Sequence, residues 1–311
     1  MVNQVFNQVT AHSTFPSSMS IVEDYDMGGN AISFLEVDGF RYPIVDSEIV
    51  KGMSQLKAKD DDILLLAYPK SGTHWTWEIT SMLLQGKAET IPHWKSKVMV
   101  ELQPQEVIDA FPASPRVLNT HVRYNQLPLQ AREKKCRMIY VLRNPKDVAV
   151  SFYNHHKSFE NLYKNYNGSL NDYLPFFLSG KTDYGSWFDS ILQWEKDIEA
   201  QRDRHPIHIM YYEDMKQNPV EEIRKLAGFL GVSGDDSLYN AVADKCSFEN
   251  MKEDKEPFDP KFKGKLLVYR KGQVGDWQNW LTPDQNEMFD KVYQEKMKDS
   301  KFKDNIRFTL P

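Results

Sequence analysis

A turn between an apolar run and a helix-like segment combines residue types that bind anions. The stretch YPKSGTHW (68–75) follows the apolar run DDILLLA (61–67). A lysine supplies positive charge, hydroxyl groups donate hydrogen bonds, and a glycine lets the backbone approach a ligand closely. The N–H groups that begin a helix favour the same charge. An ordinary turn with a solvated lysine is the alternative. The residues that would surround the anion are Lys70, Ser71, Gly72, Thr73 and His74.

Two further segments place cations where a second anion could bind. In YVLRNP (140–145), Arg143 follows an apolar run, and Ser151 comes later in a helical stretch. In YRKGQVGDW (269–277), two cations and a glycine form the run Arg270-Lys271-Gly272. An arginine fork suits a phosphate, and a helical serine adds a hydroxyl. Alternatively, the arginine pairs with a surface carboxylate and the second segment is a basic surface loop. Three basic segments together predict a ligand with phosphates at both ends.

A histidine is available for proton transfer. His121 lies in VLNTHVRYNQLP (117–128), just past the end of a predicted strand. Imidazole titrates near neutral pH, so this side chain could take a proton from a reacting group. A packed or surface histidine is the competing interpretation, because the chain has eight histidines.

The candidate residues lie near the ends of predicted strands, and these strands alternate with predicted helices along the chain. Apolar runs alternate with stretches of helical spacing, which predicts a parallel sheet with helices on both faces. Ligands bind at the carboxyl ends of the strands in such sheets. We therefore expect a single α/β domain with a central parallel sheet flanked by helices and a P-loop-like strand–loop–helix. The predicted strands are 61–70, 116–121, 136–144 and 207–214, and the predicted helices are 73–85, 145–159, 185–203, 218–231 and 282–298.

The remaining segments have weaker signals. Residues 1–30 are polar and mixed, which predicts a loosely packed arm before a domain at 31–311. Within 31–43, the pair Asp38-Gly39 separates two apolar runs and predicts a hairpin. The charged stretch 247–265 contains two prolines and is interpreted as a long loop or lid.

Composition narrows the class of protein. The 311 residues are 41% hydrophobic, enough for a sizeable core. A formal charge of -5 argues against a nucleic-acid partner or an anionic membrane surface. Cys136 and Cys246 have no metal-ligand spacing, which predicts buried free thiols in a reducing compartment. Neither a signal-peptide apolar region nor a membrane span is visible, so a cytoplasmic protein is expected.

Three segments together resemble the signature motifs of the cytosolic sulfotransferases. They are YPKSGTHW (68–75), RNPKDVAVSFYNHH (143–156) and RKGQVGDW (270–277), and they occur in the family's order. The resemblance continues through YGSW (184–187) and YYEDM (211–215). It covers nearly the whole chain from residue 35 onwards.

The resemblance implies 3′-phosphoadenosine 5′-phosphosulfate (PAPS) as sulfuryl donor and 3′,5′-adenosine bisphosphate (PAP) as product. No metal is expected, because cationic side chains would surround the anions and no cluster of metal ligands is visible in the sequence. The 5′-phosphosulfate would contact Lys70, Ser71, Gly72, Thr73 and His74, with Trp75 on the adenine. The 3′-phosphate would contact Arg143, Ser151, Arg270, Lys271 and Gly272. Tyr212 would lie near the adenine, with Cys246, Ser247 and Phe248 in place of a Thr-Ser-Phe trio. Cys246 therefore removes one hydroxyl.

The resemblance also assigns the chemistry. His121 would be the general base, Lys70 would stabilise the leaving oxygen, and Ser151 belongs to the same catalytic set. The family usually has a lysine two residues before the histidine, whereas this chain has Asn119. A neutral amide binds an anion less strongly than an ammonium does. Asn119 could slow turnover, favour another acceptor or mark an inactive nucleotide-binding homologue; if it limits the rate, Asn119→Lys should raise it.

The resemblance also bears on assembly and on the acceptor. The family's dimer motif aligns with QNWLTPDQNE (278–287), where Gln278 and Pro283 replace a lysine and a valine while Thr282 and Glu287 are kept. A monomer or a different dimer is therefore expected. The acceptor is expected to be a small lipophilic alcohol, phenol or amine.

The acceptor pocket should be walled by 92–104, 155–175 and 252–266. A phosphate-donor kinase is a second hypothesis, since Glu213-Asp214 could bind Mg²⁺. The kinase hypothesis does not explain what the basic segments around Arg143 and Arg270 would bind.

Overall fold

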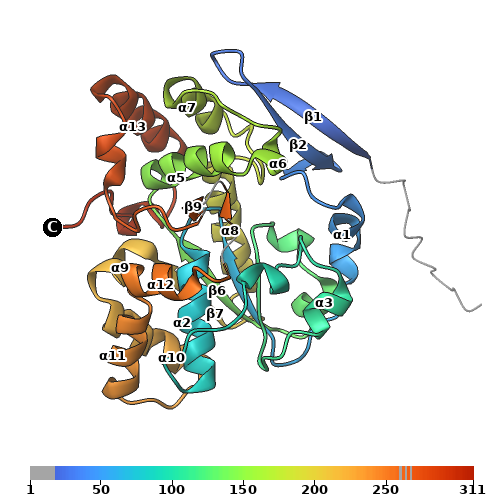
Figure 1. Cartoon of the computed structure of the whole chain (residues 1–311), viewed down its shortest axis with the longest axis vertical. Helices are drawn as coiled ribbons and strands as arrows, with labels where there is room; N and C mark the ends of the chain where they lie inside the picture. Colours follow the sequence, from blue (N-terminus) through green and yellow to red (C-terminus); the bar gives the residue numbers. More distant parts are fainter. Residues whose placement is uncertain (1–17, 259–260, 263–264, 267) are drawn as a thin grey trace, which may run out of the picture.

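A four-stranded parallel sheet forms the centre of the computed structural model, which describes residues 18–258, 261–262, 265–266 and 268–311 (Figure 1). The strand order is β5-β4-β6-β7, and every neighbouring pair is parallel. These strands are β4 Ile63–Ala67, β5 Val117–Thr120, β6 Arg137–Leu142 and β7 Ile207–Tyr211. Strands β4 and β5 are buried throughout, as expected for a sheet covered on both faces. The α/β prediction is confirmed.

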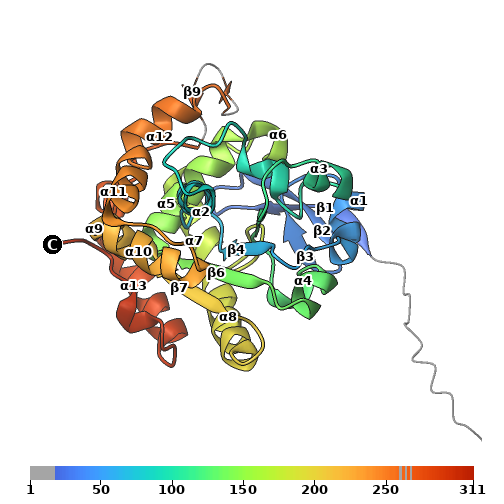
Figure 2. The ribbon, with the colours of Figure 1, turned by 90° about the horizontal axis from the view of Figure 1, so that it is seen from below.

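Helices cover both faces of this sheet. Helix α2 contacts β4 and β5, and α10 contacts both α2 and β7. Helix α8 lies on the opposite side of the strands from α2 (Figure 2), where the Trp194 ring lies 5.1 Å from the Tyr140 ring of β6, centroid to centroid. The helices are α1 Ser47–Gly52, α2 Thr73–Gln85, α3 Gln105–Asp109, α4 Leu129–Glu133, α5 Pro145–Ser158, α6 Glu160–Tyr163, α7 Leu170–Leu178, α8 Trp187–Gln201, α9 Tyr212–Gln217, α10 Pro219–Leu230, α11 Asp236–Lys245, α12 Phe248–Lys255 and α13 Pro283–Met297.

The strand order creates a binding edge. Strand β4 is flanked by β5 on one side and by β6 on the other, so the chain runs from β4 to β5 in one direction and from β6 to β7 in the opposite direction. The carboxyl ends of β4 and β6 therefore border a topological switch point, where open α/β sheets bind ligands. The turn after β4 and the residues after β6 meet at this edge.

Helix ends follow the local sequence. Pro145 begins α5, and the Asn144 side chain accepts a hydrogen bond from the Asp147 backbone N–H. Helix α10 begins at Pro219 and ends at Leu230, and Gly231 caps it with a left-handed φ of 71°. These helices match their predicted bounds closely. None of the helices in the described ranges is apolar over a length that would cross a bilayer.

The N-terminal segment differs from the predicted arm. Residues 1–17 lie outside the described residues, but Met19–Tyr25 forms strand β1, antiparallel to β2 Ala31–Val37. Most β1 side chains are exposed, so backbone pairing rather than an apolar pattern holds this strand. The predicted hairpin is confirmed: Asp38 and Gly39, with φ of 50° and 75°, join β2 to β3 Phe40–Tyr42.

The predicted loop at 247–265 is wrong over its first half. Helix α12 occupies Phe248–Lys255, and the Ser247 hydroxyl accepts from the Asn250 N–H at its start. Buried Lys255 donates to Glu78 Oε2 of α2 at 3.0 Å, which fastens a highly charged helix to the core. Short strands β8 Lys261–Phe262 and β9 Lys265–Leu266 pair antiparallel. Residues 259–260, 263–264 and 267 lie outside the described residues.

Candidate functional site

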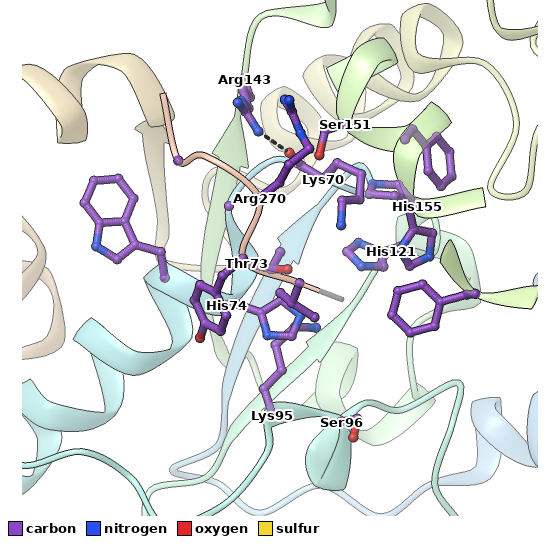
Figure 3. A pocket seen from close by; sticks show the side chains of 18 of the residues that line it. Lys70, Thr73, His74, Lys95, Ser96, His121, Arg143, Ser151, His155 and Arg270 are labelled. Carbon is purple, nitrogen blue, oxygen red and sulfur yellow. Dashed lines mark hydrogen bonds between the residues drawn. The ribbon is translucent and has the colours of Figure 1, made fainter. Parts of the chain in front are cut away.

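A cavity of about 340 Å³ opens at the carboxyl edge of the parallel sheet (Figure 3). It brings together the turn after β4, Arg143 after β6, the second half of α5, the start of α9 and the segment before η4 Asp276–Asn279. The predicted site residues on its lining are Lys70, Gly72, Thr73, His74, Trp75, His121, Arg143, Ser151, Tyr212, Cys246, Phe248, Arg270, Lys271 and Gly272. Ser71, Asn119 and Ser247 are not part of the lining.

The turn after β4 requires glycine at one position. Lys70 and Gly72 both adopt left-handed conformations, with φ of 66° and 100°. A Cβ atom on Gly72 would lie 2.7 Å from Cδ2 of Tyr212. Gly72 also caps α2 without a side chain, which leaves the first N–H groups of that helix without side-chain acceptors. The buried Ser71 hydroxyl has no hydrogen-bond partner among the described residues, so this turn offers several donors to one anion.

Arg143 connects the three basic segments. Its Nη1 donates to the Lys70 carbonyl at 3.0 Å, and its Nη2 donates to the Gln273 carbonyl at 3.2 Å. Its guanidinium lies 4.2 Å above the centre of the Tyr212 ring. Ser151, from α5, lines the same cavity as Lys70 (Figure 3). These contacts fix a cation between the β4 turn and the 270–273 segment.

The 270–272 segment carries net positive charge. Arg270 Nη1 and Lys271 Nζ each lie 2.7 Å from a different oxygen of Asp276. Burial alone would raise the pKa of Asp276, but hydrogen bonds from Lys271, Asn279 and Arg270 outweigh it and lower that pKa well below its usual value. Two cations share one carboxylate, so one positive charge is not neutralised. Gly272 has a φ of 61°, and a Cβ there would lie 2.3 Å from the Phe248 ring.

Two aromatic rings and a thiol also line the cavity, from Trp75, Tyr212 and Cys246. The Trp75 and Tyr212 rings meet edge to face at 5.5 Å, and Lys216 Nζ lies 5.2 Å from the Trp75 ring. Tyr212 is the first residue of α9, so the strand predicted through residue 214 ends earlier, at Tyr211. Cys246 is free, and burial raises the pKa of its thiol.

His121 is held in one tautomer. Its Nδ1 lies 2.8 Å from the Ala67 carbonyl oxygen at the end of β4. A carbonyl can only accept a hydrogen bond, so Nδ1 carries the proton and Nε2 has a free lone pair. Burial, followed by the charge of Lys95, lowers the pKa of His121 to about 3, although the hydrogen bond to Ala67 opposes them. The imidazole is therefore neutral at physiological pH and can accept a proton at Nε2.

The sequence did not single out Lys95. This lysine begins η2 Lys95–Val98 and is only 4% exposed. Its Nζ donates to Asn119 Oδ1 at 2.8 Å, and Asn119 Nδ2 donates back to the Lys95 carbonyl at 2.9 Å. Burial lowers the pKa of Lys95 to about 8, with Glu101 opposing the shift. A lysine between the apolar residues of 92–104 was the available signal, but sequence spacing does not reveal its contact with β5.

No group of three or more His, Cys, Asp or Glu residues in the described ranges is arranged to hold a metal ion. Glu213, which the kinase hypothesis would place on Mg²⁺, is instead buried in a structural contact. Its Oε1 accepts from the Asn144 backbone N–H at 2.9 Å, and burial raises its pKa to about 7.

Comparison with known proteins identifies the family that the sequence motifs resemble. The sulfotransferase domain family matches residues 60–301. Sulfotransferase 1B1 of Mus musculus is 39% identical over 262 residues, which cover 79% of this chain and 85% of that protein. Sulfotransferase 1C2 of Homo sapiens is 36% identical over 288 residues, which cover 86% and 94%. The crystal structure of mouse sulfotransferase SULT7A1 complexed with PAP superposes with a TM-score of 0.68 at 32% identity, covering 90% of this chain and 96% of that one. The chain belongs to the sulfotransferase family.

Proposed function

We propose that this sulfotransferase moves a sulfuryl group from PAPS to a hydroxyl or amine of a small lipophilic acceptor, with His121 as the general base. The donor is PAPS and the product is PAP, as family membership and the PAP complex of mouse SULT7A1 support. The observation that carries the mechanism is the neutral imidazole of His121, which lines the same cavity as Lys70 with its Nε2 free to accept.

The basic groups divide between two ends of the donor. The turn after β4 would hold the 5′-phosphosulfate, because it combines Lys70, the Ser71 hydroxyl and the uncapped start of α2. Arg143 and the 270–272 segment would hold the 3′-phosphate, with Ser151 adding a hydroxyl. Trp75 and Tyr212 would contact the adenine. Their edge-to-face contact at 5.5 Å gives that wall a fixed shape.

The transfer step then needs two groups of this chain. His121 Nε2 takes the proton of the acceptor hydroxyl as the acceptor oxygen bonds to sulfur. The bond from sulfur to the bridging oxygen breaks, and the Lys70 ammonium stabilises the negative charge that develops on that oxygen. Neither group requires a further co-reactant.

The lining near His121 suits a lipophilic acceptor. Trp94, Met99, Phe159 and Tyr163, all from stretches expected to wall the acceptor pocket, line this cavity. Apolar and aromatic surface with few polar groups is typical of small-molecule sites.

Two broader properties belong to the same proposal. A cytoplasmic location is inferred from the two buried free thiols. A monomer, or a dimer unlike the family's, is inferred from α13: Pro283 begins it, and Thr282 exchanges hydrogen bonds with Gln285 of its own chain. Equilibrium sedimentation measures the second property directly.

A panel of phenols, aliphatic alcohols and amines, incubated with sulfur-labelled PAPS, tests the function. We expect label transfer to at least one lipophilic acceptor. Tight PAP binding with no transfer to any acceptor class would favour the alternative hypothesis that Asn119 marks an inactive nucleotide-binding homologue.

A further inference from the structure

Three lysines are buried in the described part of the chain, and one differs from the others. Lys255 pairs with Glu78 at 3.0 Å, and Lys146 pairs with Asp290 at 2.5 Å. Lys95 instead donates to the amide oxygen of Asn119 and forms no ion pair with a carboxylate of the described residues. A buried ammonium without a direct ion pair is costly, and the charge of Glu101 offsets only part of that cost, so the position of Lys95 is better explained by a ligand than by stability.

The Lys95 ammonium is held in a defined place beside the base. Asn119 lies in β5 two residues before His121, and its amide clamps both the side chain and the carbonyl of Lys95. Figure 3 shows Lys95 and Lys70 extending from opposite sides of the cavity, with His74 and His121 between them. The two ammonium groups therefore bracket the region where donor and acceptor must meet.

The acceptor end of the cavity is electropositive. Burial and then the neighbouring lysines lower the pKa values of His74 and His155, so both imidazoles are neutral. Asp183 is the lone carboxylate among the described lining residues. It is buried, and it already accepts hydrogen bonds from His156 at 2.8 Å and from the Tyr163 hydroxyl at 2.9 Å. A protonated amine would find no counter-ion here, whereas an oxygen that becomes negative would find one.

We propose that Lys95, positioned by Asn119, contacts the acceptor oxygen and makes the site select acceptors with an acidic hydroxyl, such as phenols, over amines. The inference rests on the proposed function and names its acceptor class. As the acceptor O–H bond breaks, its proton passes to His121 Nε2 and its oxygen bonds to sulfur. Lys95 keeps its own proton and donates a charged hydrogen bond to that oxygen, which lowers the pKa of the hydroxyl.

Removing the charge tests this directly. Lys95→Met keeps the length of the side chain, and Lys97→Met in the same short helix is the matched control because Lys97 is exposed. We expect kcat/KM for a phenol to fall about 10- to 100-fold in Lys95→Met, the loss of one charged hydrogen bond. We expect unchanged PAP affinity, a reduced preference for the phenol over an amine, and wild-type behaviour in Lys97→Met.

Moving the ammonium group from position 95 to position 119 distinguishes an electrostatic role of Lys95 from a purely structural one. In the double variant Lys95→Met, Asn119→Lys, the lysine comes from β5, and we expect much of the phenol activity to return. Asn119→Lys alone should lower activity, because it buries two ammonium groups side by side. The neighbouring Lys95 thus reverses the gain expected from the sequence for this substitution.

A spectroscopic measurement does not depend on turnover, and its wild-type arm does not depend on the folding of a variant. Para-nitrophenol bound to the wild-type protein with PAP should ionise at a pH clearly below that of the free phenol. Lys95→Met should lose this shift. A wild-type complex without the shift, or an unchanged phenol-to-amine preference in Lys95→Met, would overturn the inference while leaving sulfuryl transfer intact. A wild-type protein that binds PAP and sulfates no acceptor would contradict the proposed function itself.

Discussion

At the residue scale, the backbone carbonyl of Ala67 decides what His121 can do. Because Nδ1 donates to that carbonyl, Nε2 is the only ring atom that can take a proton. The buried setting keeps this nitrogen unprotonated well below neutral pH. A nearby carboxylate would have the opposite effect, and Glu101 instead accepts from the His121 backbone N–H at 3.0 Å.

The lowered pKa of His121 predicts a pH dependence of stability. The ordinary pKa of 6.5 applies to the unfolded chain and a pKa of about 3 to the folded protein. The unfolded state therefore binds the proton first, and stability is lost progressively as the pH falls below 6.5. His121→Gln should lose less unfolding free energy than wild type between about pH 7 and about pH 4. Urea unfolding of both proteins across this pH range measures the unfolding free energy. If that free energy changes with pH equally in both proteins, the lowered pKa of His121 is contradicted.

At the element scale, the turn between β4 and α2 depends on Gly72. An alanine there would adopt a strained φ of 100° and meet the Tyr212 ring at 2.7 Å. We expect Gly72→Ala to cost about 1–3 kcal/mol of stability and to abolish measurable PAP binding. Gly228→Ala in α10 is the control, because its added Cβ meets nothing within 4 Å. Thermal unfolding and calorimetry with PAP report both effects, and near-normal binding by Gly72→Ala would show that the turn tolerates a side chain.

Sequence periodicity predicted β4 and α2, which build this turn, but it did not predict β1 or α12. The buried run Ile63–Ala67 and the helix that follows it carry strong local signals. Strand β1 and helix α12 do not, because β1 is held by backbone pairing and α12 by distant contacts such as Lys255 with Glu78. Lys95 was missed for the same reason: its partner Asn119 is 24 residues away, and only tertiary structure brings them together.

At the scale of the whole molecule, Arg143 links segments that are far apart in the chain. It donates to the carbonyls of Lys70 and Gln273, which lie 73 and 130 residues away. The family motifs indicated that these segments share a ligand, and the structure places them on one cavity.

Arg143 should therefore set the preference for a 3′-phosphate. Wild type is expected to bind PAP more tightly than ADP, because ADP lacks that phosphate. Arg143→Ala should weaken PAP binding by about 1.5–3 kcal/mol and change ADP binding far less. Calorimetry with both nucleotides measures the difference, and equal losses for PAP and ADP would remove the 3′-phosphate from this residue.

The central claim is that a neutral His121 acts as general base in the cavity that binds the donor. Single-turnover sulfuryl transfer from PAPS, compared between wild type and His121→Ala, tests it most directly, with PAP affinity measured on the same samples. A positioned base contributes about 10²- to 10⁴-fold, so we predict a rate loss of that size with PAP affinity nearly unchanged. A His121→Ala protein that transfers the sulfuryl group at the wild-type rate would contradict the account.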